Sequence, residues 1–124
     1  MNVLEINVLV LAYIGDCVYE NYIRHYLVNK KIGNVNDLQT ESINYVSARA
    51  QAKFLEEMLD NNFFTEEEIS VIKRARNYKS NSHPKNTDIV TYKHATGLEA
   101  LIGYLDLLGR KDRIDEIMRN ILGE

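Results

Sequence analysis

The chain has 124 residues, the length of one domain, and its 45% hydrophobic and 27% charged residues are typical of a globular protein. This composition excludes a disordered or fibrous chain, and no run of about 18 uncharged apolar residues predicts a membrane span. The N-terminus lacks the basic segment of a signal peptide, and the single Cys17 cannot form an internal disulfide or a zinc cluster. We therefore expect one domain over residues 1–124, in the cytoplasm, without membrane contact.

Apolar residues recur at helical spacing along nearly the whole chain, so we expect an all-α fold of five or six helices. The predicted helices cover residues 4–28, 36–60 with a break near Ser47, 66–78, 87–108 and 111–122. Asn2 with Glu5 forms a capping-box pattern at the start of the first predicted helix, and Thr65 with Glu68 forms another at the start of the helix over 66–78. Residues 8–14 are apolar on every side of the first helix, which predicts that this helix is buried.

Two carboxylates occupy positions where helices usually bury aliphatic side chains. Asp16 follows the apolar segment of the first helix, and Glu99 lies within the apolar sequence LEALI. A buried carboxylate is costly unless it is paired, protonated or bound to a cation. Alternatively, Asp16 lies at the surface with a salt-bridge partner, and Glu99 lies at the edge of an amphipathic helix.

Glycines accompany both acids. Gly15 directly precedes Asp16, and Gly103 lies one turn after Glu99, each inside a predicted helix at a cost of about 1 kcal/mol relative to alanine. A helix crossing at the glycines would bring the acids together, although simple helix packing explains the glycines equally well. Paired carboxylates without a basic neighbour in sequence suit a hard divalent ion such as Mg²⁺, which takes oxygen ligands.

Two neighbours of Asp16 have simpler interpretations. Glu20, one turn later, is a weaker candidate ligand, because Arg24 one further turn along favours a salt bridge with it. Cys17 has no histidine near it in the sequence, which favours a small apolar filler over a nucleophile. We expect the eight tyrosines to serve core and interface packing.

Charge is unevenly distributed along the chain, whose formal net charge is −3. Residues 56–68 contain six acidic and no basic residues, whereas residues 73–94 contain six lysines and arginines against Asp88 alone. This basic segment also contains Asn, Ser and His, a mixture typical of surfaces that contact phosphate and sugar oxygens. Double-helical RNA fits it better than a single strand, because stacking aromatics are few. A solvated charged loop is the simpler alternative.

Five segments follow one another in an order known from one family. They are LAYIGDCVYE at 11–20, VSARAQA at 46–52, KRARN at 73–77, PKNTD at 84–88 and ATGLEALIGY at 95–104. Together they resemble the mini-ribonuclease III family over nearly the whole chain. The IGD segment is similar to the signature helix of ribonuclease III enzymes, and LEALIG is similar to their second acidic helix.

The resemblance implies an all-helical ribonuclease III domain that forms a two-fold homodimer and cleaves double-stranded RNA with Mg²⁺. It also implies a role in maturing the large-subunit (23S) ribosomal RNA precursor, with a ribosomal protein on that precursor as a further candidate partner. Asp16 and Glu99 match the family's catalytic and metal-binding acids, and residues 46–52 match a structural helix near the site. The residues on the matching RNA-facing segment are Arg74, Arg76, Asn77, Lys79, Ser80, His83, Lys85 and Asn86.

The sequence also departs from larger ribonuclease III enzymes. It has Leu9, Ala12 and Thr96 where those enzymes carry further acids, a thinner set that the mini family shares. The number of metal ions therefore stays open, and the RNA phosphate is a candidate additional ligand. The separate double-stranded-RNA-binding domain of the larger enzymes is not expected.

Two alternative functions remain on the sequence alone. The first is a non-catalytic dimeric RNA-binding protein in ribosome assembly, which has no need of both Asp16 and Glu99. The second is a helical protein-interaction domain, whose partner binding would be nearly independent of salt. Phosphate contacts instead give a steep loss of affinity as salt rises.

Overall fold

The computed structural model describes residues 2–79, 85 and 87–124, and all regular structure within them is helical. This confirms the all-α class. The elements are a short 3₁₀ helix η1 (Val3–Glu5), followed by α1 (Val8–Asn29), α2 (Val35–Val46), α3 (Ala48–Asp60), α4 (Glu66–Arg76), α5 (Ile89–Leu107) and α6 (Lys111–Leu122). None of the described helices is long and apolar enough to cross a lipid bilayer.

Side-chain caps explain where several helices begin. The Thr65 hydroxyl accepts from the Glu68 amide at 3.2 Å, and the Glu68 carboxylate accepts from the Thr65 amide at 2.9 Å, which is the predicted capping box of α4. Ser47 separates α2 from α3, and its hydroxyl caps α3 by accepting from Ala50 N–H. The expected break near Ser47 is therefore confirmed.

Three predicted starts were wrong by a few residues. Asn2 caps only η1, and α1 begins after Asn7, whose side-chain oxygen accepts from Leu9 N–H at 2.8 Å. Asn34 caps α2 in place of Asn36, and Asp88 caps α5 in place of Thr87. In each case another residue with a suitable side chain stood close by, and the sequence pattern did not distinguish between the two.

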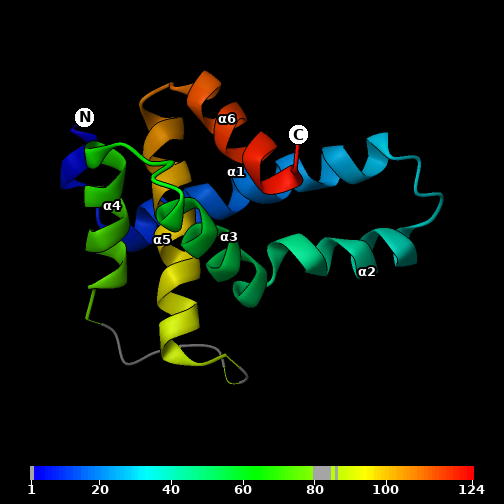
Figure 1. Cartoon of the computed structure of the whole chain (residues 1–124), viewed down its shortest axis with the longest axis horizontal. Coiled ribbons are helices and arrows are strands. Elements are labelled where there is room, and N and C mark those ends of the chain that lie inside the picture. The colour runs from blue at the N-terminus through cyan, green and yellow to red at the C-terminus, as the bar shows by residue number, and fades with distance from the viewer. Residues whose placement is uncertain (1, 80–84, 86) are drawn as a thin grey trace.

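Helix α5 forms the centre of the fold and packs against α1, α3, α4 and α6. Figure 1 shows α1 crossing α5, while the second half of α1 extends away from the centre beside α2. Nearly all of α5 from Ala95 to Leu105 is buried, so this helix is apolar on most sides. The structure thus places Glu99 within the most buried helix of the domain.

The expected burial of α1 on all sides was wrong. Leu11, Gly15 and Tyr19 are buried against the core, but Tyr13 is 78% exposed and Val10 is 50% exposed. Leu9 and Cys17 are exposed on the same side, so Cys17 is not an apolar filler of the core. Although α1 is apolar on all sides, the rest of the chain covers only one of its faces.

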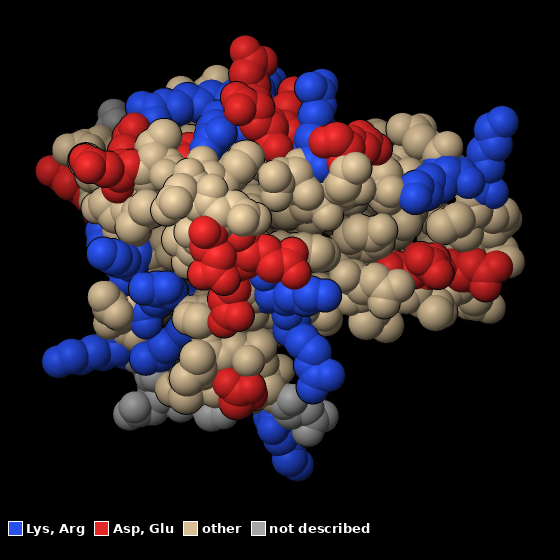
Figure 2. All heavy atoms as spheres, viewed as in Figure 1, with Lys and Arg blue, Asp and Glu red and all other residues tan. Residues whose placement is uncertain are grey.

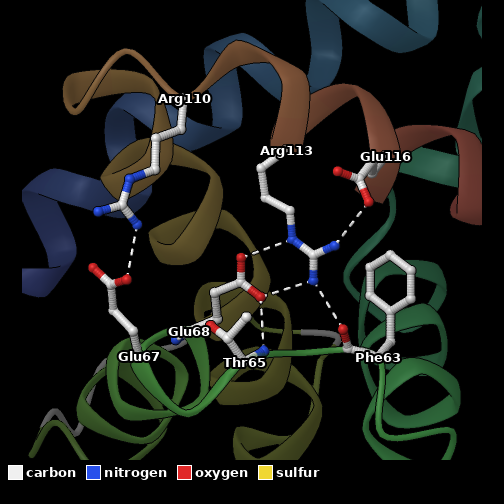
Figure 3. Close-up of polar contacts among 7 residues, drawn as sticks. All are labelled: Phe63, Thr65, Glu67, Glu68, Arg110, Arg113 and Glu116. Atoms are coloured by element: carbon white, nitrogen blue, oxygen red, sulfur yellow. Dashed lines mark hydrogen bonds and ion pairs between the residues drawn. The ribbon is translucent and has the colours of Figure 1, made fainter.

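A polar cluster fixes α6 to the start of α4 (Figure 3). The Arg113 guanidinium donates to both carboxylate oxygens of Glu68 at 2.8 and 2.9 Å, to the Phe63 carbonyl oxygen at 2.8 Å and to Glu116 at 3.2 Å. Glu68 is only 2% exposed. Burial raises its pKa, but the hydrogen bonds from Arg113 and from the Thr65 amide outweigh this effect and lower the pKa on balance.

Candidate active site

The candidate site lies where α1 crosses α5, and two glycines make this crossing close. A Cβ atom built on Gly15 would lie 1.7 Å from the carbonyl oxygen of Glu99. A Cβ atom built on Gly103 would lie 1.9 Å from the carbonyl oxygen of Leu11. Neither position has room for a side chain, so the glycines permit a backbone contact that alanine would prevent. The predicted helix crossing at Gly15 and Gly103 is present.

The crossing brings the side chains of Asp16 and Glu99 together. Asp16 is exposed, whereas Glu99 is half-buried. Burial, a hydrogen bond with Asp16 and the negative charge of Asp16 together raise the pKa of Glu99 to about 8. In the absence of a cation, burial and the neighbouring Asp16 therefore favour the protonated form of Glu99.

Glu20 and Gln51 complete the surroundings of Glu99. The negative charge of Glu20 also raises the pKa of Glu99, by a smaller amount, while the Gln51 side chain lowers this pKa. Glu20 forms the expected salt bridge with Arg24 at 3.5 Å. Among the described residues, the charged groups that shift the pKa of Glu99 are therefore all acidic. Sequence reasoning missed Gln51, because only the packing of α3 on α5 shows that this side chain is buried.

The chemistry of these donors fits a divalent cation. Carboxylate oxygens are the preferred ligands of hard ions, and a cation between Asp16 and Glu99 would relieve the repulsion that holds the proton on Glu99. Within the part of the chain that the structure describes, no three histidine, cysteine or acidic side chains converge on one point. A cation held here would therefore take most of its ligands from water or from a bound phosphate.

The basic residues predicted to contact RNA lie around the end of α4 and the start of α5. Figure 2 shows Lys and Arg side chains gathered at the lower left and lower edge of the molecule, next to these helix ends in the view of Figure 1. Asn77 is the C-cap of α4, and Lys79 and Lys85 are exposed. Ser80, His83 and Asn86 lie outside the described residues.

Two arginines of this group also make contacts within the protein. Arg74 donates to the carbonyl oxygen of Ile6 at 3.3 Å, which directs its guanidinium toward the N-terminal segment. The side-chain carbon Cγ of Arg76 would lie 3.4 Å from a Cβ on Gly97, so its aliphatic stem packs across α5. Their contribution to RNA binding stays a prediction.

Comparisons with known proteins identify the family of this chain. The Ribonuclease III domain family model matches residues 9–110. Mini-ribonuclease 3 of Enterococcus faecalis is 46% identical over 92% of this chain and 86% of that protein. Mini-ribonuclease 3 of Clostridium tetani is 48% identical over 95% of this chain and 78% of that protein.

A solved structure shares the fold as well. Protein FN1578 from Fusobacterium nucleatum superposes with a TM-score of 0.87 at 29% identity, over 97% of this chain and 96% of that one. The crossing of α1 and α5 lies entirely within the region that the family model matches. The chain therefore belongs to the ribonuclease III domain family, in its mini-ribonuclease group, and it is an endoribonuclease.

Proposed function

We propose that this endoribonuclease cuts double-stranded RNA with the help of Mg²⁺ held by Asp16 and Glu99. Double-stranded RNA is the substrate that a ribonuclease III domain implies. The observation that carries the site assignment is the pairing of two carboxylates at a helix crossing, where burial and Asp16 raise the pKa of Glu99 to about 8. Two carboxylates side by side destabilise a fold, so their pairing favours a role in binding a cation over a structural role.

The two acids have different parts in the reaction. Bound Mg²⁺ would supply neutralisation of phosphate charge and a more acidic water for hydrolysis. Glu99 must release its proton for the site to carry its full negative charge, and its position on the buried helix α5 fixes its location. Asp16 is exposed and can meet the RNA backbone from the surface of α1. Water adds to the scissile phosphorus, the 3′-oxygen leaves, and the products end in 5′-phosphate and 3′-hydroxyl groups.

The basic end of the molecule would hold the duplex. Exposed Lys79 and Lys85 lie on the segment between α4 and α5, and Figure 2 shows other basic side chains near it. Lysine and arginine neutralise backbone phosphates without reading bases, which suits a helical RNA recognised by its shape.

A second copy of the chain would cover the exposed apolar face of α1. Leu9, Val10 and Tyr13 are 38%, 50% and 78% exposed, and helical spacing places exposed Cys17 on the same side. An exposed apolar stripe on one helix is typical of a subunit interface. A two-fold axis through α1 would place one site on each side of the axis, as expected for cutting both strands of a duplex. Asp16 lies at the border of this face.

The family resemblance of the sequence implies a role in maturing the 23S ribosomal RNA precursor. We propose that precursor as the substrate in the cytoplasm, with a ribosomal protein bound to it as a candidate partner. A base-paired stem of the precursor supplies the double-stranded RNA.

The decisive experiment compares the wild type with Asp16→Asn on a precursor duplex in Mg²⁺. This substitution keeps the shape of the side chain and removes its charge. We expect cleavage with 5′-phosphate ends by the wild type in Mg²⁺ and not in Ca²⁺. We expect a loss of at least 100-fold in cleavage rate for Asp16→Asn while duplex binding persists. Equal cleavage by both proteins would reject the assignment of Asp16.

A further inference from the structure

Gln51 is a polar residue in an apolar environment. It lies on α3, on the face that packs against α5, and its side chain is only 3% exposed. Its buried neighbours on α3 are apolar, among them Ala52 and Leu55. A leucine or methionine of similar size would fill this position without the cost of burying an amide.

The side-chain amide nitrogen of Gln51 also has no hydrogen-bond acceptor among the described residues. Nε2 is fully buried, and no acceptor among the described residues meets hydrogen-bonding geometry with it. A buried donor without an acceptor destabilises a fold, so its presence requires a reason other than stability. The Arg74 guanidinium contains another such buried nitrogen, but a second nitrogen of the same group donates to Ile6.

The position of the amide supplies that reason. Helix α3 packs on α5, and the Gln51 side chain lies beside the Glu99 carboxyl group, so its buried Nε2 has this carboxyl as a neighbouring acceptor. An N–H donor favours the ionised form of a carboxylate, which is the form that binds a cation. A methionine would fill the space without this interaction.

We propose that Gln51 is a positioning residue for Glu99. When Glu99 ionises to hold a cation, the unpartnered Nε2–H group of Gln51 donates to one of its carboxylate oxygens and thereby orients the other oxygen toward the cation shared with Asp16. This inference rests on the proposed function of the two acids and extends the site to a third helix, α3. It explains why an amide is buried where an apolar residue would pack better. Gln51 contacts neither RNA nor metal in this arrangement and acts only through Glu99.

The test replaces Gln51 by Met, which keeps the volume and the helix propensity and removes the donor. Three quantities are measured on the full chain: the single-turnover cleavage rate at saturating duplex RNA, the KM for the duplex, and the dissociation constant of Mn²⁺ alone, by electron paramagnetic resonance without RNA. We expect the rate to fall at least tenfold with KM within twofold of the wild type. We expect the Mn²⁺ dissociation constant to rise at least fivefold.

The melting temperature separates positioning from folding. Because the amide is buried without a partner, Gln51→Met should melt at the wild-type temperature or higher. Gln39→Met provides the matched control on the exposed surface of α2 and should leave all these quantities unchanged. Wild-type rate and Mn²⁺ affinity in folded Gln51→Met would overturn the proposal.

A second variant, Gln51→Leu, repeats the test with another apolar shape. Unfolding of both variants would also overturn the proposal, because it would give the amide a structural role. The Asp16→Asn protein keeps the two hypotheses apart. Cleavage by Asp16→Asn at the wild-type rate would reject the proposed site as a whole. An inactive Asp16→Asn beside a fully active Gln51→Met would reject only the role of Gln51.

Discussion

The backbone of Gly15 lies directly against the carbonyl oxygen of Glu99. A Cβ on Gly15 would overlap this oxygen at 1.7 Å and would lie 2.8 Å from the amide nitrogen of Gly103. The contact that packs α1 on α5 is therefore the one that sets Asp16 beside Glu99. Stability and the candidate site depend on the same few backbone atoms.

Gly15→Ala should destabilise the protein by about 3 kcal/mol or more, or prevent folding, because backbone atoms of α5 cannot yield as a flexible side chain can. Urea unfolding followed by circular dichroism measures this change. Gly33→Ala is the control, since no atom lies within 4 Å of the added Cβ, and its free energy of unfolding should stay within about 1 kcal/mol of the wild type. Similar stability of the two variants would contradict the described crossing.

Glu99 should make the metal-free protein less stable as pH rises. Burial and Asp16 raise the pKa of Glu99 to about 8, so the folded state retains a proton that the unfolded state loses near its ordinary pKa of about 4.5. The free energy of unfolding should therefore fall by about 1 to 3 kcal/mol between about pH 4.5 and 8.

Glu99→Gln removes this titration and serves as the comparison. Its stability relative to the wild type should increase across the same pH window, while cleavage is lost. Urea unfolding in a chelator at several pH values measures the difference. A constant difference from pH 5 to pH 8 would show that Glu99 ionises normally.

Arg113→Met should destabilise the protein by about 3 kcal/mol, because it leaves the buried Glu68 carboxylate without its cation. The double variant Arg113→Met/Glu68→Gln should recover part of this loss, since no charge then remains unpaired. Thermal melts of the wild type, both single variants and the double variant measure the coupling. Additive effects would show that the two side chains do not interact.

The same ion pair predicts acid sensitivity. Its hydrogen bonds lower the pKa of Glu68 on balance, so this group stabilises the fold above its ordinary pKa, and that contribution is lost as pH falls through the lowered value. The wild type should therefore lose stability in acid more steeply than the double variant Arg113→Met/Glu68→Gln. Parallel pH profiles would contradict this expectation.

Lys79→Ala/Lys85→Ala should weaken binding of duplex RNA about tenfold and reduce the slope of log K against log salt by about 2, if each lysine contacts one phosphate. Filter binding in the Asp16→Asn background avoids cleavage during the measurement. Lys111→Ala, at the start of α6 and the opposite end of α5, should leave the slope unchanged (Figure 1). An equal effect of both changes would argue against a localised RNA surface.

Tyr13→Arg should prevent dimer formation, because it places a charge in the centre of the exposed apolar face of α1. Light scattering coupled to size-exclusion chromatography should give a dimer for the wild type and a monomer for the variant. Val28→Arg, exposed near the far end of α1, is the control and should remain dimeric. A monomeric wild type would reject the proposed interface.

Much of the fold followed from local rules in the sequence. The helix crossing was predictable because a glycine inside a helix is unfavourable unless another backbone approaches it, as at Gly15 and Gly103. The capping box of Thr65 and Glu68 marked the start of α4 for a similarly local reason. The last helix also has the predicted bounds, Lys111–Leu122.

Other features depend on contacts that no local pattern encodes. Arg113 and Glu68 are 45 positions apart, and nothing in the sequence assigns one to the other. The exposure of Tyr13 was missed because an apolar helix looks the same whether its own chain or a second chain covers it. Gln51 was missed because burial of a single polar residue becomes visible only once α3 is packed on α5.

The crossing of α1 and α5 has a consequence for the order of events during synthesis. Asp16 is translated early, but the segment bearing Glu99 emerges 83 residues later. If the two acids act together as proposed, a nascent chain cannot cut the ribosome's own RNA until α5 has been made and has docked on α1. On the same proposal, a polypeptide truncated before α5 should have no cleavage activity.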